Sequence, residues 1–215
     1  EVWLCSGQSN MGMTVNSVTN AQLEIAAADY PQIRLLSVSL TTANEPQKEC
    51  KVRGWELCAS NTVGSFTAAG YFFGRKLHKD LKVPIGLINS SWGGTCIEAW
   101  TSWEVQKDDP AMQALKKSWD ERDKTYTPEA DRKQFEADKL ALAAWNKGDK
   151  KTKAPRPRLQ GQPLKSQNYP ANLFNAMINP LVPYAIKGAI WYQGEANAGR
   201  GKEYRGQMAR LIVNW

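Results

Sequence analysis

Four apolar runs without polar alternation are the feature that most constrains how this 215-residue chain can fold. The runs lie at residues 2–5, 33–38, 83–89 (VPIGLIN) and 185–192 (AIKGAIWY). Continuous hydrophobicity is typical of strands that are covered on both faces, as in a parallel sheet, whereas a half-exposed strand alternates apolar and polar residues. The runs therefore predict buried strands of one parallel sheet.

Helical patterns separate these predicted strands. Residues 64–81 (GSFTAAGYFFGRKLHKDL) carry apolar side chains at helical spacing, and Pro84 follows as a stop signal. Residues 171–183 (ANLFNAMINPLVP) predict a short helix, and residues 202–215 (KEYRGQMARLIVNW) predict another. Strands that alternate with helices predict an α/β fold, in which right-handed crossovers connect parallel strands and helices flank the sheet.

Residues 102–166 interrupt this alternation. They contain two charged, helix-prone stretches, 110–126 and 128–148, each of which begins with a proline, a residue favoured in the first turn of a helix. We interpret 102–166 as a helical hairpin and a basic loop inserted into a single domain that covers residues 1–215, a length that suits one domain. A solvated lid or packing flap is favoured over a separate binding module.

The formal net charge of +7 is concentrated in one segment. Seven basic residues and one acidic residue lie between Lys147 and Lys165, in a stretch rich in lysine, proline and glycine that is typical of a solvated loop. Aromatic residues are not interleaved with these charges, as they are in many nucleic-acid-binding segments. We therefore expect no nucleic-acid partner; polyanion binding, the alternative, would depend steeply on salt.

No apolar run approaches the ~20 residues that a membrane-spanning helix requires, so we expect no transmembrane segment and no membrane partner. The sequence opens with Glu-Val-Trp rather than with methionine and a basic, apolar leader. The compartment therefore has to be inferred from other features.

The cysteines give no metal-binding pattern. Cys5, Cys50, Cys58 and Cys96 show no paired C-x-x-C spacing, and the chain has a single histidine. A zinc site takes its ligands from such groups, so no metal is expected. Cys50 and Cys58 could form a disulfide in an oxidising compartment or remain free thiols, and the sequence leaves both alternatives open.

Polar or glycine-rich residues follow three of the four predicted strands. They are Gly7-Gln8-Ser9-Asn10, the segment 89–95 (NSSWGGT) and the segment 193–197 (QGEAN). Each segment alone is consistent with an ordinary turn or helix cap. Ligands of doubly wound sheets bind at the carboxyl ends of the strands, where these three segments would meet. Together they supply a hydroxyl nucleophile, backbone donors and amide side chains, which are the groups that acyl transfer requires.

Three blocks of this sequence resemble a known family. GQSNM (7–11), NSSWGGT (89–95) and WYQGEANA (191–198) are similar to the blocks of the sialate O-acetylesterase group of SGNH hydrolases, relatives of the GDSL esterases. The similarity covers roughly residues 2–101 and 167–215. It implies a flavodoxin-like sheet flanked by helices, a periplasmic or secreted location, and a cofactor-independent esterase. The implied reaction removes O-acetyl groups from a small or oligosaccharide substrate, with sialic acid of the 9-O-acetyl type expected and acetylated xylan or pectin as alternatives.

The resemblance also assigns roles to residues. Ser9 matches the nucleophile, and its own N–H is expected in the oxyanion hole. Gly93 matches the second donor, where a side chain would crowd the acyl oxygen. The third block departs from the Gly-x-Asn-Asp pattern of GDSL enzymes, so the Gln193 amide is expected as the third donor and Asn197 is the alternative.

Other residues near these blocks have two interpretations each. Glu195 either orients a catalytic histidine as the acid of a triad or holds its loop by accepting backbone hydrogen bonds. Trp92 and Asn197 are candidates for sugar contact, because aromatic faces stack on sugar rings; Trp92 is equally consistent with a core anchor.

A general base for Ser9 is the group that this sequence does not supply. The family provides a histidine in an Asp-x-x-His block, and no such block occurs here. The single histidine, His78, lies six residues before Pro84, toward the amino edge of the sheet. A strand of about six residues spans about 20 Å at ~3.3 Å per residue, whereas a hydrogen bond to Ser9 needs about 3 Å. We interpret His78 as a solvent-facing helix residue.

The sequence therefore predicts an SGNH domain that is incomplete at both ends and lacks its last strand and catalytic histidine. The alternative function is an SGNH-like module that binds acetylated glycan without turnover.

Overall fold

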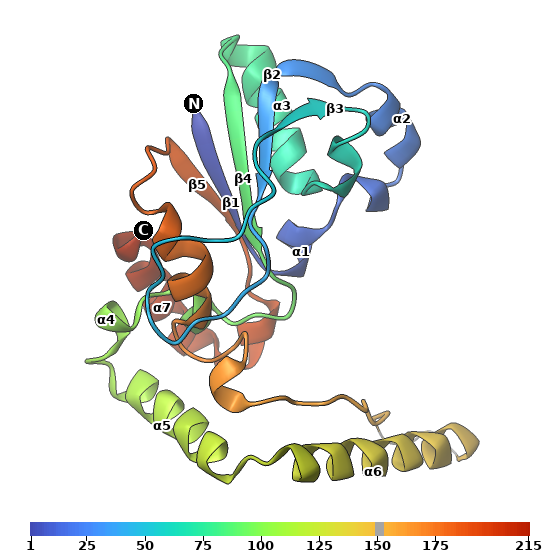
Figure 1. The fold of residues 1–215 in the computed structure, drawn as a ribbon, viewed down its shortest axis with the longest axis vertical. Helices are drawn as coiled ribbons and strands as arrows, with labels where there is room; N and C mark the ends of the chain where they lie inside the picture. The colour runs from blue at the N-terminus through green and yellow to red at the C-terminus, as the bar shows by residue number, and fades with distance from the viewer. Residues whose placement is uncertain (149–152) are drawn as a thin grey trace.

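The computed structural model describes residues 1–148 and 153–215 and has a five-stranded sheet at its centre (Figure 1). The strands lie side by side in the order β3-β2-β4-β1-β5. Their bounds are β1 Val2–Gly7, β2 Asp29–Ser37, β3 Glu56–Ala59, β4 Ile85–Ser91 and β5 Gly188–Tyr192. The α/β fold class predicted from the apolar runs is confirmed.

The sheet differs from the prediction at one edge and in its order. β3 pairs antiparallel with β2, so the sheet is mixed, and its four residues were too short a run to stand out in the sequence. The parallel strands lie side by side in the order β2-β4-β1-β5. If these four strands are numbered 1 to 4 along the chain, the order is 2-3-1-4, whereas the flavodoxin order is 2-1-3-4-5. β1 therefore lies between β4 and β5, which places two neighbours beside the strand that leads to Ser9.

The register of β1 makes the carboxyl ends of three strands level. Gly7, the last residue of β1, is the partner of Ser91 in β4 and of Tyr192 in β5. Both pairings are parallel, so the segments that follow these three strands leave the sheet at the same edge. This edge is where the sequence predicted a site.

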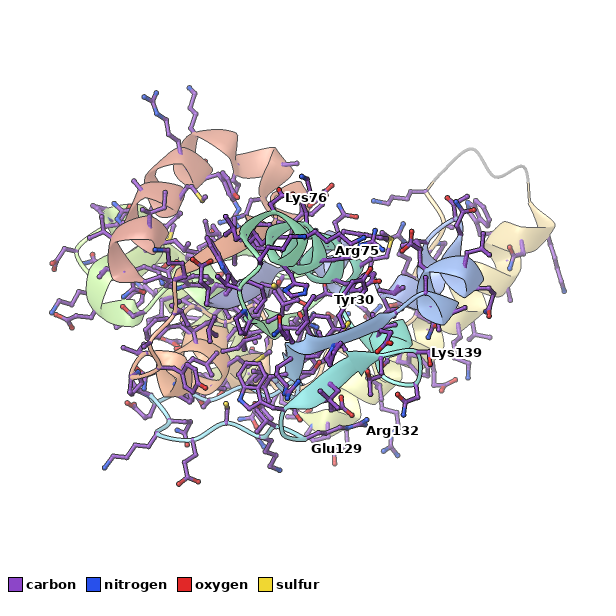
Figure 2. All side chains as sticks on the ribbon, turned by 90° about the horizontal axis from the view of Figure 1, so that it is seen from above. Tyr30, Arg75, Lys76, Glu129, Arg132 and Lys139 are labelled. Atoms are coloured by element: carbon purple, nitrogen blue, oxygen red, sulfur yellow. The ribbon has the colours of Figure 1, made fainter. Side chains whose placement is uncertain are left out.

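Helix α3 (Ala68–Leu81) covers one face of the sheet and runs from this edge to the opposite one. The Thr67 side chain caps its first turn by accepting from the Gly70 N–H at 3.2 Å, as serine and threonine do at helix starts. Its Tyr71 ring meets the Tyr30 ring of β2 edge-on at 6.4 Å. One turn later lies Arg75, and Figure 2 labels it near Tyr30.

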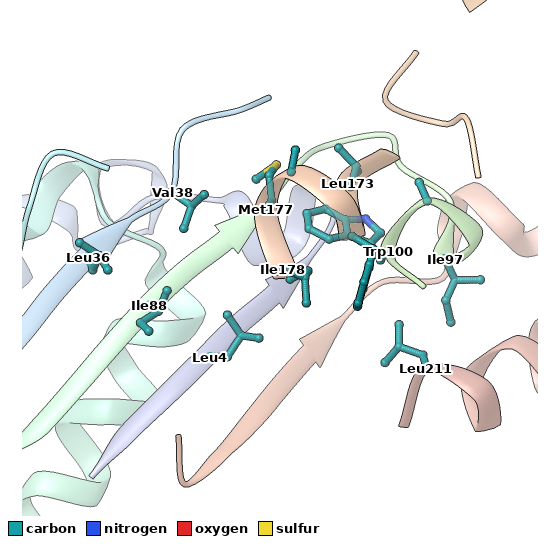
Figure 3. Close-up of a cluster of buried hydrophobic side chains, with 13 residues drawn as sticks. Leu4, Leu36, Val38, Ile88, Ile97, Trp100, Leu173, Met177, Ile178 and Leu211 are labelled. Carbon is teal, nitrogen blue, oxygen red and sulfur yellow. The ribbon is translucent and has the colours of Figure 1, made fainter. Parts of the chain in front are cut away.

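The core consists of two clusters on the two faces of the sheet. Leu87 and Ile88, neighbours in β4, are both fully buried and belong to different clusters, as expected for a strand covered on both sides. Figure 3 shows the cluster that contains Ile88, where Leu4 of β1 and Trp100 pack with Met177. This face is covered by segments that come late in the chain.

Shorter elements and α7 complete the fold. The predicted helix at 171–183 is a π-helical turn followed by a 3₁₀ turn, and the predicted C-terminal helix is α7. The remaining helices outside the insertion are α1 and α2, and single 3₁₀ turns lie between elements. The bounds are α1 Ser9–Gly12, α2 Ala21–Ala26, the π turn Phe174–Ile178, the 3₁₀ turn Asn179–Leu181 and α7 Gly201–Asn214.

The insertion forms α4 (Trp103–Gln106), α5 (Pro110–Thr125) and α6 (Pro128–Lys147). Both long helices begin with the predicted proline. They do not form the predicted hairpin: α6 continues away from the end of α5, and the chain returns along α6 toward the body (Figure 1). The physical reason is that both linking residues, Tyr126 and Thr127, have extended backbone, so the chain does not reverse there.

The basic segment, the helices and the cysteines were each the subject of a prediction. Two lysines of the basic segment, Lys150 and Lys151, lie outside the described residues. No helix in the described part of the chain is long and apolar enough to cross a bilayer. Cys50 and Cys58 are both free thiols here, which is the second of the two alternatives left open.

We expect Leu87→Ala to lower the free energy of unfolding by about 2–5 kcal/mol, because Leu87 has no exposed surface and its loss leaves a cavity between β4 and α3. The measurement is a urea denaturation curve for each variant. Leu140→Ala on α6 is the matched control, since Leu140 is 74% exposed and its truncation should change stability by about 0.5 kcal/mol or less. Equal losses in the two variants would contradict this assignment of the core.

Candidate functional site

Gly7 makes the turn that carries the chain from β1 to Ser9. Its φ is +141°, which side-chain-bearing residues rarely adopt, and a Cβ atom there would overlap the carbonyl oxygen of Tyr192. The same carbonyl accepts a hydrogen bond from the Gln8 N–H at 2.9 Å. The chain thus turns against the end of β5, and Ser9 becomes the first residue of α1.

Helix α1 is fixed to the body behind Ser9. Met11 is buried, and its carbonyl accepts a hydrogen bond from the Thr67 hydroxyl at 2.6 Å. Ser9 itself is exposed. Neither its hydroxyl nor its N–H has a hydrogen-bond partner among residues 1–148 and 153–215, so both are free to meet a ligand.

Gly93 lies beside Ser9, as the sequence predicted. A Cβ atom built at Gly93 would be 3.5 Å from the Ser9 Cβ and 3.9 Å from its backbone nitrogen. The Gly93 N–H also lacks a partner within the described chain. Two unpaired backbone donors therefore flank an unpaired hydroxyl, which is the arrangement that stabilises an oxyanion in acyl transfer.

The loop that carries Gly93 is held from both sides. The Trp92 N–H donates to the Gly7 carbonyl at 3.0 Å. The Gln167 amide donates to the Gly93 carbonyl at 3.2 Å, and the Asn168 amide donates to the Gly94 carbonyl at 3.1 Å. Residues that follow the insertion thus fix the position of this loop.

Two residues adjacent to Ser9 fasten the third loop. The buried Gln8 side chain accepts hydrogen bonds from the N–H groups of Gly194 at 3.4 Å and Ala196 at 3.3 Å. The Asn10 amide donates to the Glu195 carboxylate. Gln8 and Asn10 were expected only as turn residues; their signal in the sequence was their place on either side of Ser9 within one motif.

Neither predicted third donor is available in this structure. The Gln193 amide nitrogen donates to the Thr95 carbonyl at 2.9 Å and to the Asn197 side-chain oxygen at 2.7 Å. The Asn197 amide nitrogen donates to the two carboxylate oxygens of Glu98, at 3.2 and 3.0 Å. The Gln193 amide therefore uses both of its hydrogens, whereas the Asn197 amide is buried and bound to the single carboxylate of Glu98. The expected role of Gln193, with Asn197 as the alternative, does not match this geometry, because both amides hold the loop instead.

Glu98, which was not among the residues predicted for the site, accepts the hydrogen bonds of Asn197. It is 1% exposed, binds Asn197, and forms an ion pair with Arg200 at 2.6 Å. The sequence did contain a signal for Glu98, since it is a charged residue inside the apolar run IEAW. A charge that is buried with such a run needs partners. Burial and the Glu98 charge raise the pKa of the neighbouring Cys96 thiol, so Cys96 is not an activated nucleophile.

Trp92 is a core anchor, and its sugar contact stays a prediction. Its half-buried ring packs against the core cluster of Leu4 and Trp100. It also lines a cavity of about 300 Å³ together with residues of the 160–167 segment. The ring can therefore anchor the loop and still present part of its surface to a ligand.

His78 is far from Ser9, as the sequence predicted. Its Nδ1 hydrogen-bonds to the Val83 carbonyl at 2.9 Å, just before β4 begins. Ser9 follows the other end of the sheet, and the seven residues of β4 span about 20 Å at ~3.3 Å each. The ring is half-buried against Tyr30 rather than solvent-facing, a correction that follows from its backbone hydrogen bond. Within the described chain, no group of three or more His, Cys, Asp or Glu side chains could hold a metal ion.

A family model for carbohydrate esterases, described as sialic acid-specific acetylesterases, matches residues 1–155. The chain belongs to this family. The resemblance drawn from the three sequence blocks is thereby confirmed.

Relatives in this family match over the whole chain. A sialate O-acetylesterase from Rattus norvegicus is 36% identical over 229 residues, and one from Homo sapiens is 33% identical over 224 residues. Both alignments cover 100% of this chain, but 39% of the rat protein and 35% of the human protein. The crystal structure of a carbohydrate acetylesterase from Xanthomonas citri superposes with a TM-score of 0.71 and 29% identity, over 100% of this chain and 37% of that one. This chain therefore spans less than two fifths of the length of these relatives.

We expect Glu98→Ala to destabilise the protein by at least about 2 kcal/mol, because it leaves Asn197 and Arg200 without their partner. The loss should be smaller than the ~3–5 kcal/mol of a fully buried pair, since the Arg200 side chain is 36% exposed. Chemical denaturation measures it. Glu136→Ala, which removes an exposed pair with Lys139 on α6, should leave the midpoint nearly unchanged. A Glu98→Ala variant as stable as this control would contradict a structural role for the carboxylate.

Proposed function

We propose that these residues form the nucleophile and oxyanion side of a serine esterase that removes O-acetyl groups from carbohydrate, with 9-O-acetylated sialic acid as the substrate. The observation that carries the proposal is the pairing of the unbonded Ser9 hydroxyl with the free Gly93 N–H on the neighbouring loop. Membership of the acetylesterase family supports the same reaction. The rat and human relatives bear the name sialate O-acetylesterase, which supports the choice of sugar.

The proposed reaction begins when the Ser9 hydroxyl oxygen attacks the carbonyl carbon of the acetyl ester. The carbonyl oxygen becomes negative and accepts hydrogen bonds from the N–H groups of Ser9 and Gly93. The serine proton passes through a general base to the sugar oxygen, which leaves as a hydroxyl group. Water then attacks the acetyl-serine, and acetate departs. No cofactor takes part in these steps.

The general base has to come from a group other than the histidine of this chain. His78 bonds to Val83 at the far edge of the sheet, so it cannot take the Ser9 proton. The Asp-x-x-His block of the family is the expected source. The exposed Ser9 hydroxyl leaves room for such a base to approach.

The remaining site residues receive proposed roles from their contacts. Glu195 positions the third loop through Asn10, which favours the loop-holding interpretation over the triad acid. The oxyanion hole is proposed to use the two backbone donors, since the Gln193 amide already donates to two acceptors and the buried Asn197 amide is bound to Glu98. Trp92 is proposed to contact the sugar ring with its exposed part.

The alternative function is a module that binds acetylated glycan without turnover. It was considered because no hydrogen bond joins the Ser9 hydroxyl to a base in the part of the chain that the structure describes, but membership of the acetylesterase family favours the esterase over it. A periplasmic or secreted location is a further proposal, supported by the family resemblance, and cell fractionation would test it. Acetylated xylan and pectin fragments are the substrates to compare with acetylated sialic acid.

We expect Ser9→Ala to abolish hydrolysis of p-nitrophenyl acetate and of 9-O-acetylated sialic acid by the protein as the cell makes it, because the variant has no oxygen to acylate. The measurement is the initial rate of acetate release. Ser60→Ala, at another exposed serine, is the matched control and should keep the wild-type rate. Turnover that survives Ser9→Ala would overturn the proposal, and absence of turnover in the wild type would favour the binding module.

We expect Gly93→Ala to lower kcat roughly 10- to 100-fold, since the new methyl group would crowd the carbonyl oxygen beside Ser9. Its stability should change little, because the nearest atoms to the new Cβ are at ordinary contact distances of 3.5 Å or more. Gly94→Ala provides the contrast. Gly94 has a φ of +72°, so alanine there strains the backbone and lowers the melting temperature without placing a methyl group near Ser9. Equal effects of the two variants on kcat would contradict the proposed position of the oxyanion.

A further inference from the structure

The Gly93 N–H, which the proposed function uses as an oxyanion donor, belongs to the peptide that joins Trp92 to Gly93. In a trans peptide such as this one, the N–H and the C=O lie in one plane and point in opposite directions. The direction of the Gly93 N–H therefore depends on what holds the Trp92 carbonyl.

The side chain of Thr95 holds this carbonyl. The Thr95 hydroxyl donates a hydrogen bond to the Trp92 carbonyl oxygen at 2.7 Å. Threonine hydroxyls make such local bonds to the backbone a few residues away and so fix the shape of a loop. Thr95 has no exposed surface, so water does not compete for its hydroxyl group.

A second hydrogen bond fixes the direction of the first. The Trp100 Nε1 donates to the Thr95 hydroxyl oxygen at 2.9 Å. An indole nitrogen can only donate and a carbonyl can only accept, so the single hydrogen of the hydroxyl points to Trp92. Trp100 is fully buried in the cluster that Figure 3 shows. The chain of hydrogen bonds that ends at the Gly93 peptide therefore starts in the core.

Other side chains hold the carbonyls that follow in this loop. The amides of three residues do so, with Gln167 bound to Gly93, Asn168 to Gly94 and Gln193 to Thr95. All three carbonyls belong to peptides that come after the Gly93 N–H in the chain. The Thr95 hydroxyl differs from these amides because it bonds the peptide that carries the donor itself.

We propose that Thr95 is a positioning residue of the esterase, whose hydroxyl orients the Gly93 N–H toward the carbonyl oxygen of the acetyl group. The inference rests on the proposed function, since it concerns one of the two donors of that oxyanion hole. The hydroxyl also polarises the peptide, because a carbonyl that accepts a hydrogen bond makes the N–H at the other end of its peptide a stronger donor. Both effects act on the oxygen that becomes negative in the reaction.

Thr95→Val tests the inference in the protein as the cell makes it, because valine has nearly the shape of threonine and lacks the hydroxyl. We expect kcat and kcat/KM for p-nitrophenyl acetate to fall together by roughly tenfold, a part of the roughly 100- to 1,000-fold that one oxyanion donor contributes. KM should stay nearly the same, since the donor acts chiefly on the charge of the transition state. Thr95→Ser keeps the hydroxyl and should restore most of the rate.

Thr101→Val is the matched control. Thr101 is also fully buried, and its hydroxyl donates to the Ile97 carbonyl at 3.1 Å, in a peptide that does not carry the Gly93 N–H. Both valine variants lose a buried hydrogen bond, so both should have lower melting temperatures. Only Thr95→Val should have a lower kcat. If Thr95→Val does not fold, Thr95→Ala removes the same hydroxyl from a smaller side chain and should show the same fall.

A second measurement reads the donor without turnover. It is the ¹⁵N NMR signal of Gly93 in protein labelled with ¹⁵N-glycine, which is identified by its absence from Gly93→Ala. Loss of the hydrogen bond to the Trp92 carbonyl leaves more electron density on the nitrogen of the same peptide. We therefore expect the signal to move to lower frequency in Thr95→Val and to keep its position in Thr95→Ser and Thr101→Val.

Three results would overturn the inference. They are a wild-type kcat in Thr95→Val, an equal fall of kcat in Thr101→Val, and a Gly93 signal that keeps its position in Thr95→Val. Absence of turnover in the wild type is a different failure, because it refutes the proposed function. The NMR signal would then still decide whether the Thr95 hydroxyl holds the donor.

Discussion

The close approach of β1 to β5 at Gly7 is the constraint on which the candidate site depends. The left-handed backbone and the missing side chain of Gly7 let the chain turn against the Tyr192 carbonyl. Because this turn is immediate, Ser9 follows the strand after a single intervening residue. The register that pairs Gly7 with both Ser91 and Tyr192 then brings the next two loops to the same level. A larger residue at Gly7 would separate the strands and the loops together.

The second constraint is a network of hydrogen bonds that occupies the side-chain amides near the site. Gln8 accepts from the backbone of the third loop, while Gln193 and Asn197 donate to groups within the chain. Buried amides need partners, and Glu98 provides two of them beneath the loop. In this structure both amides are therefore bound within the chain. The donors that stay free, at Ser9 and Gly93, are backbone groups whose positions follow from the strand ends.

The sequence alone was sufficient to predict those features of the fold that depend on burial and on the order of residues along the chain. The apolar runs predicted the parallel strands because burial on both faces removes polar residues, and the position of His78 followed from counting residues to β4. The edge strand β3 is too short and too exposed to carry such a pattern. The directions of α5 and α6 depend on the backbone angles of Tyr126 and Thr127, which no periodicity encodes. The role of Gln193 depended on a partner distant in the sequence, the Thr95 carbonyl.

The geometry around Ser9 and the general base that an esterase needs are independent of each other. Ser9 and Gly93 are set by hydrogen bonds within the sheet and its loops, so their geometry does not require the base. A serine without a base is a weak nucleophile, but two free N–H groups still attract a carbonyl oxygen. In the proposed reaction, binding of the acetyl group and its hydrolysis would therefore depend on different groups. The loops after β1 and β4 would bind the acetyl group, and a histidine would decide whether the bond breaks.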